Sequence, residues 1–294
     1  MVYLSVCFIY VVVLVLRIGY HVSISESIDL AFDRAKEAGC TAMQIFPSNP
    51  RGWEVKKLSD EEVANFRKKS KSFGIEPVFV HMPYLPNLAS PDKLKYEKSI
   101  EALNDAAERC RLLGIKHIIT HLGSHMGSGK SAGIERVAHA INSVKDAADV
   151  IVLMENEAGQ KNSVGSELED LAELYDRIDV KTGFCFDTCH AFAAGYDIAK
   201  ISVLDQIASV LGLEKVVAIH MNDAKYELNS HLDRHENIGF GKIGIRGFGS
   251  FFKYRSISHK PVILETPRDG KISARAELGV AKEIILKAEG GAKE

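Results

Sequence analysis

The stretch GFCFDTCH, residues 183–190, places a carboxylate, a thiol and an imidazole directly after a short apolar and aromatic run. Such a run is typical of a buried β-strand, and Asp187 stands where that strand would end. Five further apolar runs end on a His or a Glu in the same way: VFVHMPY (78–84), HIITHLGSH (117–125), VLMENEAGQ (152–160), VVAIHMND (216–223) and VILET (262–266). This repetition is typical of a (β/α)₈ barrel, because active sites in that fold lie at the C-terminal ends of the strands.

Strand-like and helix-like segments alternate from residue 17 onward. The predicted strands are 17–22, 41–46, 76–81, 116–121, 150–155, 181–187, 215–220 and 260–265. The predicted helices are 26–39, 59–73, 92–113, 131–148, 166–178, 198–212, 246–254 and 275–289. Ser59 is a good N-cap, and Gly39, Gly74 and Gly114 stand just past helix ends, where glycine is favoured. Eight β–α units without a Pro/Ser linker predict an α/β chain forming one closed TIM barrel, with a metal site at the C-terminal ends of its strands.

The first residues stand apart from this pattern. Residues 2–16 read VYLSVCFIYVVVLVL, a run shorter than the ~20 residues that a spanning helix needs. No basic region precedes the run and no small-residue cleavage site follows it. We therefore expect 1–16 to be a hydrophobic N-terminal extension, either a loose one or the product of a translation start placed too far upstream, and 17–294 to form a single barrel domain. We expect no membrane partner, and a membrane anchor is the alternative for this segment.

Charge and cysteine content limit the partners and the compartment. Lys and Arg number 37 and Asp and Glu 39, a net charge of −2, so a nucleic-acid partner would need a local basic face or bound cations. The five cysteines lack the spacing of a disulfide scaffold, which favours the reducing cytoplasm. Cys185, two residues before Asp187 on a predicted strand, should point into the barrel core.

The strand-end residues should meet at one rim, because parallel barrel strands converge at their C-terminal ends. A lone His there is more often structural than a ligand, but six strand ends of this kind together predict a shared pocket. The residues are His81, His121, Glu155, Asp187, His220 and Glu265. Imidazole and carboxylate ligands suit Zn²⁺, with Mn²⁺ or Fe²⁺ as substitutes.

A second set of ligands is predicted from DRHENIGFGKIG, residues 233–244. Asp233 and His235 alternate around Arg234, so both side chains would face one side of an extended loop. With His190 they make a three-ligand set that leaves an open coordination position. His21, at the end of the first strand, either supports a ligand from behind or is a structural histidine.

Together these residues resemble the endonuclease IV family of apurinic/apyrimidinic (AP) endonucleases. The resemblance runs from Arg17 to the last helix and rests on motifs in the family's order: GYHVS, FPSNPRGW, VHMPY, THLGSH, ENEAGQ, FDTCHAFAAGYD, IHMNDAK, DRHENIG and ILET. It implies a barrel with three zinc ions, with Glu155 as the catalytic residue bridging two of them. One bridged ion would be completed by His81 and His121. The implied ligands of the other two are Asp187, His220 and Glu265 for one, and His190, Asp233 and His235 for the other.

The resemblance also implies the reaction and its substrate. The family cleaves duplex DNA 5′ to an abasic site, leaving a 3′-hydroxyl and a 5′-deoxyribose phosphate, and removes blocking groups from 3′ ends in base excision repair. Arg51, Tyr84 and Leu85 take the DNA-contacting role, since an Arg and an apolar wedge can penetrate a duplex. Trp53 and Tyr84 could instead simply pack the rim. We expect a monomer, because the duplex must lie across an open rim.

Two other classes compete with this interpretation. Metal-dependent sugar isomerases and epimerases share the barrel class and its strand-end ligands. A non-catalytic protein that stores metal or scaffolds DNA is the other alternative. The second ligand set and the rim residues favour the nuclease, because a small sugar would need neither. Metal content discriminates: near three ions per chain favours the nuclease, and one or two favours the isomerase.

Overall fold

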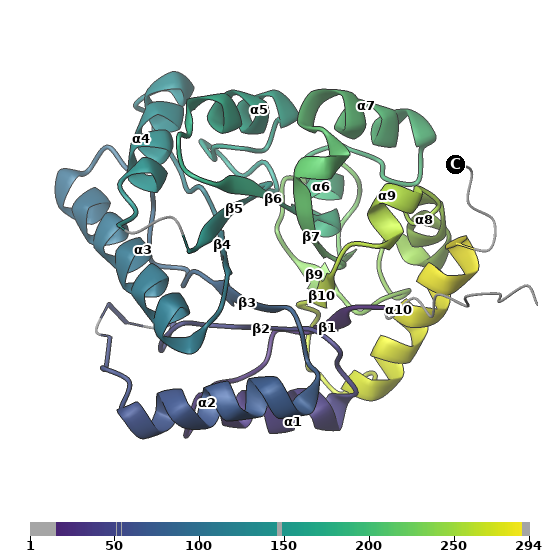
Figure 1. Ribbon diagram of the computed structural model, residues 1–294. Helices are drawn as coiled ribbons and strands as arrows, with labels where there is room; N and C mark the ends of the chain where they lie inside the picture. Colours follow the sequence, from purple (N-terminus) through teal and green to yellow (C-terminus); the bar gives the residue numbers. More distant parts are fainter. Residues whose placement is uncertain (1–15, 51, 54, 146–148, 290–294) are drawn as a thin grey trace, which may run out of the picture.

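The computed structural model describes residues 16–50, 52–53, 55–145 and 149–289. Eight parallel strands form a central barrel, and the main helices lie around its outside (Figure 1). The barrel strands are β1 (Ile18–Tyr20), β2 (Met43–Ile45), β3 (Val78–His81), β4 (His117–Thr120), β5 (Ile151–Glu155), β6 (Thr182–Asp187), β7 (Val216–His220) and β10 (Val262–Leu264). They follow one another in chain order around the barrel, and β10 lies between β7 and β1. The predicted TIM barrel is confirmed.

The barrel closes where β1 meets β2. His21 and Gln44 form an isolated parallel bridge there, and the Val22 N–H donates to the Gln44 carbonyl at 2.7 Å. Gly19 is required at this junction, because a Cβ atom on it would lie 1.7 Å from the Ala42 carbonyl oxygen. The seam between β1 and β2 is therefore narrow and held by few backbone hydrogen bonds.

The helices begin and end largely where local signals predict. They are α1 (Leu30–Ala38), α2 (Asp60–Phe73), α3 (Lys93–Leu113), α4 (Lys130–Asn142), α5 (Leu168–Arg177), α6 (Thr188–Ala193), α7 (Ile201–Leu211), α8 (Gly244–Phe251), α9 (Arg255–Ser258) and α10 (Ala274–Glu289), with a 3₁₀ turn η1 (Leu213–Lys215). Ser59 and Glu62 form a capping box at the start of α2. Gly39, Gly74 and Gly114 end three helices with φ of 82°, 66° and 77°.

Several predicted helix boundaries differ from the structure. The helix expected over 131–148 ends at Asn142, whose side chain donates to the Arg177 carbonyl and accepts from the Asp179 N–H. The helix expected to start at residue 26 starts at Leu30, because Ser27 and Asp29 form a local side-chain hydrogen bond instead. The helix expected over 246–254 is α8, which runs from Gly244 to Phe251, and α9 is a separate short helix that begins at Arg255. In the first two cases, polar side chains make hydrogen bonds that compete with a longer helix.

Two elements between the barrel strands were not foreseen. Helix α6 follows β6 immediately, and Asp187 caps it by accepting the His190 N–H at 2.7 Å. Strands β8 (Asp223–Ala224) and β9 (His235–Glu236) pair antiparallel as a two-stranded ribbon within the β7–β10 connection. Both elements are too short to give a periodic sequence signal.

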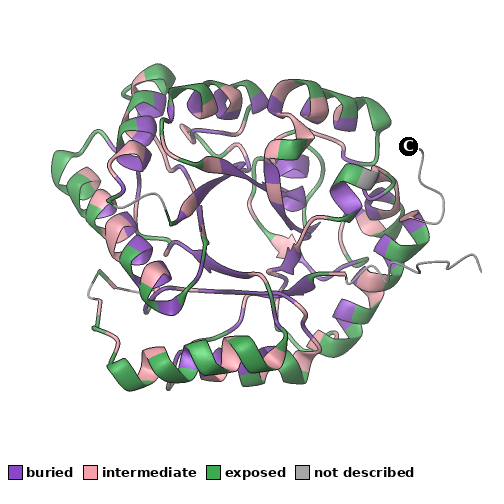
Figure 2. Cartoon of the chain, in the orientation of Figure 1, coloured by how far each residue is buried: buried purple, intermediate pink, exposed green. Residues whose placement is uncertain are grey.

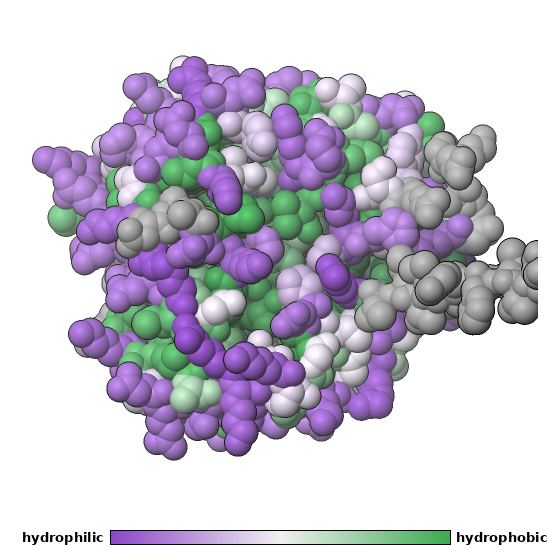
Figure 3. All heavy atoms as spheres, in the orientation of Figure 1, coloured by the Kyte–Doolittle hydropathy of each residue, from purple (hydrophilic) through white to green (hydrophobic). Residues whose placement is uncertain are grey.

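The apolar core has two parts. The larger part lies between the strands and the helices, whose inward faces are buried (Figure 2). Hydrophilic residues dominate the outer helices on the face drawn in Figure 3, and apolar residues show mainly toward the centre of that view. The smaller part fills the barrel: Ala42, Phe79, Ile119, Leu153, Cys185, Ala218 and Ile263. The predicted position of Cys185 in the barrel core is thus confirmed.

No helix in the described residues has both the length and the apolar character needed to cross a bilayer. The hydrophobic extension predicted at 1–16 lies outside the described residues except for Leu16, which packs partly buried against the core.

Candidate metal centre

The barrel interior places the candidate ligands by the two-residue period of a strand. Side chains at i and i+2 of a strand point to the same face, so the residue two positions beyond each inner-core residue also faces the interior. Seven strands contribute such pairs: Ala42 with Gln44, Phe79 with His81, Ile119 with His121, Leu153 with Glu155, Cys185 with Asp187, Ala218 with His220, and Ile263 with Glu265. All six predicted strand-end residues therefore lie in one layer, next to the seven apolar residues that fill the barrel.

Glu155 stands at the centre of this layer and is fully buried. Its Oε2 atom lies 3.0 Å from Nε2 of His81 and 3.6 Å from Nε2 of His121. The three side chains form one group whose ligand atoms lie within 4.8 Å of one another. One oxygen of Glu155 is thus turned toward two imidazoles from β3 and the β4 end.

The other oxygen of Glu155 faces a different group. Its Oε1 atom lies 2.8 Å from Nδ1 of His220. The same nitrogen is 3.2 Å from Oε2 of Glu265 and 3.8 Å from Oδ2 of Asp187. These four residues form a second group with ligand-type spacing, so the carboxylate of Glu155 is shared between two sets of neighbours.

Three further side chains gather beside this layer from outside the barrel strands. Nε2 of His190, on α6, lies 3.2 Å from Oδ1 of Asp233, and Nε2 of His235 lies 3.4 Å from the same oxygen. His235 Nε2 is also 3.7 Å from Asp187 Oδ2. The buried thiol of Cys189 is close to Asp233 and His235, but burial raises its pKa, which keeps it protonated. The structure therefore brings together all nine predicted ligands in three neighbouring groups.

The histidine rings are held so that one nitrogen of each faces this cluster. Nδ1 of His81, His190 and His235 donates to a backbone carbonyl, at 2.7, 2.9 and 3.2 Å respectively. A carbonyl only accepts hydrogen bonds, so these rings carry their proton on Nδ1 when neutral. His121 Nδ1 lies 3.2 Å from Oε1 of Glu157, which has the same effect. A ring held in this way presents the Nε2 lone pair, as metal-binding histidines do.

The charges and hydrogen bonds of this cluster favour bound cations. His235 Nε2 is buried without a hydrogen-bond partner among the described residues, although carboxylates lie close to it. Burial lowers the pKa of His121, but the charges of Glu155 and Glu157 outweigh this and raise it to about 10. The cluster thus stabilises positive charge strongly, and its nitrogen and carboxylate donors suit Zn²⁺. On these grounds the residues fit the metal ions that the sequence predicts.

Comparison with known proteins identifies the family. The xylose isomerase-like TIM barrel family matches residues 32–287. A probable endonuclease 4 from Methanoculleus marisnigri is 48% identical over 276 residues, covering 91% of this chain and 98% of that protein. The chain belongs to the endonuclease IV family. The predicted resemblance is confirmed, and with it the prediction of an AP endonuclease.

Solved structures agree with this assignment and show how widely the fold is used. Endonuclease IV from Thermus thermophilus superimposes with a TM-score of 0.83 at 34% identity, covering 92% of this chain and 99% of that one. A D-tagatose 3-epimerase-like protein superimposes with a TM-score of 0.72 at 20% identity, covering 93% and 100%. The second likeness shows a shared fold alone, which explains why fold by itself left the epimerase alternative open.

Several residues that contact the candidate ligands were not predicted from the sequence. Asn222 donates to Oδ2 of Asp187 at 2.6 Å and accepts the Glu265 N–H at 2.8 Å. Asn156 accepts the Asp187 N–H at 2.7 Å. Asn156 directly follows a predicted ligand in ENE, and Asn222 stands two residues after one in HMND, so this closeness was the available signal. His21, left open between two roles, lies with Nδ1 3.3 Å from Oε1 of Glu265.

Asp223 organises the loop that carries Asp233 and His235. Its fully buried carboxylate accepts the N–H groups of Gly239, Gly241, Ile243, Gly244 and Ala224. Glycine fits here because a Cβ atom on Gly241 would lie 2.5 Å from Asp223 Oδ1. The glycine-rich stretch after β9 thus wraps around a single carboxylate.

The predicted DNA-contacting residues lie at the rim. Tyr84 is 74% exposed, with its ring 5.6 Å from that of Phe46, and Leu85 is 37% exposed. Both line a groove of about 460 Å³ that also includes His121 and Asp233. Trp53 is 38% exposed, with the Lys98 ammonium 6.0 Å from its ring. Arg51 lies outside the described residues.

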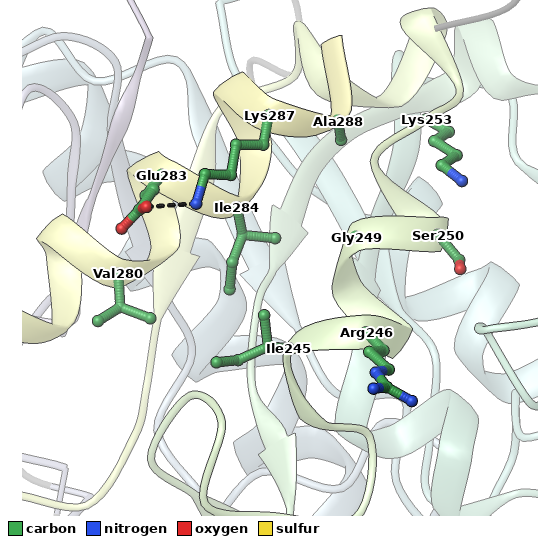
Figure 4. Close-up of a pocket in the computed structure, with 10 residues that line it drawn as sticks. All are labelled: Ile245, Arg246, Gly249, Ser250, Lys253, Val280, Glu283, Ile284, Lys287 and Ala288. Atoms are coloured by element: carbon green, nitrogen blue, oxygen red, sulfur yellow. Dashed lines mark ion pairs between the residues drawn. The ribbon is translucent and has the colours of Figure 1, made fainter. Parts of the chain in front are cut away.

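Another hollow, of about 510 Å³, lies between α8 and α10 and contains none of the candidate ligands. Figure 4 shows Ile245, Val280 and Ile284 at this hollow, with the Glu283–Lys287 ion pair on α10 beside it. The candidate ligands are therefore gathered at the strand ends, and this outer groove contains none of them.

Proposed function

We propose that this chain is a zinc-dependent DNA repair nuclease that hydrolyses the phosphodiester 5′ to an abasic site, leaving a 3′-hydroxyl and a 5′-deoxyribose phosphate. The same site would remove blocking groups from 3′ ends. The observation that carries the proposal is the position of Glu155, whose two oxygens face different groups of ligands. That arrangement suits a pair of ions sharing one carboxylate, beside a third ligand set.

The proposed zinc ligands follow the three groups of side chains. His81, His121 and Glu155 would hold one ion; Glu155, Asp187, His220 and Glu265 the second; and His190, Asp233 and His235 the third. Mn²⁺ and Fe²⁺ fit the same donors as substitutes. When bound, divalent ions of this kind activate water at neutral pH and neutralise the charge on a phosphate.

The chain's own residues supply position and selectivity. The hydrogen bonds from His81, His190 and His235 to backbone carbonyls fix which nitrogen faces the site. At the rim, Tyr84 and Leu85 are exposed beside the groove that leads to His121. We assign to them, with Arg51, the contact with DNA. An abasic nucleotide has lost its base stacking, so extruding it costs less than extruding an intact one.

The net charge and the cysteines bear on how the protein attracts DNA and on its compartment. A net charge of −2 gives the chain no overall attraction for DNA, so the proposed cations would supply it at the site. The four cysteines that the structure describes are free and buried, which fits a cytoplasmic enzyme. We expect a monomer, because the groove beside Tyr84 must stay open to a duplex.

The test is incision of a duplex that carries one abasic-site analogue. Incision 5′ to the site is expected from the protein as purified, to disappear after prolonged chelation and to return when zinc is added back. An undamaged duplex is the control, and end-group analysis of the products checks for the 3′-hydroxyl. Metal analysis should give close to three ions per chain. Incision that survives complete metal removal, or its absence from fully loaded protein, would contradict the proposal.

A further inference from the structure

Gln44 ends β2 inside the barrel, in the same layer as the candidate ligands. It is fully buried, and it reaches this layer because the inner-core residue Ala42 lies two positions before it. Neither the ligand sets nor the predicted DNA contacts include Gln44. A buried amide in an otherwise apolar strand is costly unless its hydrogen bonds are made.

The orientation of the Gln44 amide is fixed by what it contacts. Its Nε2 atom lies 2.6 Å from Oε1 of Glu265 and 2.9 Å from Nδ1 of His21. A carboxylate only accepts hydrogen bonds, so the Gln44 atom beside it must be the amide nitrogen. The amide nitrogen of Gln44 is thus turned toward both Glu265 and His21.

The amide oxygen therefore faces His220. Gln44 Oε1 lies 2.8 Å from Nε2 of His220. An amide oxygen only accepts, so His220 carries a proton on Nε2. This leaves Nδ1 of His220 as the nitrogen that faces Glu155 and Glu265.

His21 supports this arrangement from the other side of the seam. Its Nδ1 lies 2.9 Å from the amide nitrogen of Gln44, and its ring packs against Phe46 with 4.1 Å between ring centroids. His21 and Gln44 also form the parallel bridge that closes the barrel between β1 and β2. The same pair of residues thus closes the barrel and contacts two candidate ligands.

We propose that Gln44 is a positioning residue for the second metal ion: it holds the Glu265 carboxylate and fixes the ring tautomer of His220 from one amide. This inference rests on the proposed function, since it assumes that Glu265 and His220 bind an ion. An apolar side chain in its place would leave Oε1 of Glu265 without its shortest hydrogen bond and the His220 N–H without an acceptor. Losing such outer contacts typically weakens metal binding by about 10- to 100-fold.

The test compares Gln44→Met with the wild type as full-length, zinc-loaded proteins. Met is close to Gln in length but offers no N–H donor and no strong acceptor. Zinc release to a chromogenic chelator should show one of three ions leaving about 10- to 100-fold faster in the variant. In cobalt-substituted protein, the visible absorption of that ion should change, which a purely structural role would not produce.

Two further variants separate positioning from folding. Asn104→Ala is the control, because Asn104 also uses its amide for two hydrogen bonds, to Ile100 and Lys145, away from the ligands. It should lose stability without changing zinc release. Gln44→Asn keeps the amide but is one methylene shorter, and it replaces Gln44→Met if that variant does not fold.

The outcomes distinguish this inference from the proposed function. Wild-type protein that binds fewer than three ions tightly would overturn the proposed metal sites themselves. Wild-type protein with three ions, together with Gln44 variants whose zinc release and cobalt spectrum match those of the wild type, would overturn only the role of Gln44. Accelerated loss of a single ion with an altered cobalt spectrum would support it.

Discussion

The proposed ligands come from two differently built regions. Glu155, Asp187 and His220 belong to barrel strands and are fully buried. Asp233 and His235 come from the β7–β10 connection, and their side chains are 33% and 16% exposed. We call the first kind strand-borne and the second loop-borne. The difference separates a site fixed by the barrel from one fixed by a local scaffold.

Each region is held by a different kind of hydrogen bond. The strand-borne ligands inherit their positions from parallel pairing, in which Glu155 lies beside Cys185 and Asp187 beside His220. The ribbon with His235 depends on buried carboxylates. Glu277 on α10, for example, accepts from the side chain of Asn237 at 3.1 Å and from the Ile238 N–H at 2.8 Å.

This difference indicates that the ion proposed at His190, Asp233 and His235, here called the loop-borne ion, should exchange faster than the other two. Those two are called the strand-borne ions. Strand positions move only if the barrel opens, whereas the β7–β10 connection can open locally at a lower free energy. Substitutions in the two regions should therefore differ in how many ions are lost, and in whether the fold is affected.

The largest effect is expected from Glu155→Gln. A neutral amide cannot supply negative charge to two ions at once, so both should bind weakly. Incision of an abasic duplex in single turnover should fall at least about a thousandfold, or roughly 4 kcal/mol of barrier. Glu169→Gln, on the first turn of α5, is the matched control. If the variant keeps both ions and near-normal incision, Glu155 is not needed to hold the strand-borne ions.

A smaller effect is expected from His235→Asn. It removes one loop-borne ligand, so one ion per chain should be lost while the two strand-borne ions remain. Incision should fall by about a hundredfold, on the scale of losing one strong electrostatic contact in the transition state. Metal analysis, carried out together with the rate measurement, counts the ions that the variant keeps. Loss of all three ions would mean that the two regions act as one unit.

Asp223→Asn tests the scaffold rather than a ligand. The amide would turn an N–H group toward backbone donors, which costs about 1–3 kcal/mol of unfolding free energy. Hydrogen exchange over 233–244 should accelerate, and the loop-borne ion should leave roughly tenfold faster. Asp205→Asn, on the exposed face of α7, should change neither the hydrogen exchange over 233–244 nor the release of the ion. Faster release of the strand-borne ions instead would show that Asp223 supports the barrel.

The smallest effect is expected from Tyr84→Ala, at the rim. Tyr84 is 74% exposed, so stability should change by no more than about 0.5 kcal/mol, and metal content should not change. Affinity for an abasic duplex should fall by about 1 kcal/mol, or roughly fivefold, through lost aromatic contact. Fluorescence anisotropy with abasic and intact duplexes measures both affinities. Equal losses for the two duplexes would assign Tyr84 to general DNA binding.

Much of this could be predicted from sequence because the signals are local. The strand ends were recognisable from apolar runs that stop at a ligand, and Cys185 two residues before Asp187 pointed inward by the period of a strand. The caps at Ser59, Gly39 and Gly74 needed only neighbouring residues. The nine ligand types and the family also followed from short motifs such as FDTCH and DRH.

What only the tertiary structure decided involves partners far apart in the chain. Gln44 contacts Glu265 and His220, which are 221 and 176 residues away. Asp223 gathers N–H groups up to 21 residues ahead, and neither residue stands in a motif that reveals its partners. The sequence determined which side chains reach the rim, because strand period and local caps act over a few residues. The fold decided how those side chains are oriented, because hydrogen bonds across the barrel exist only once it has closed.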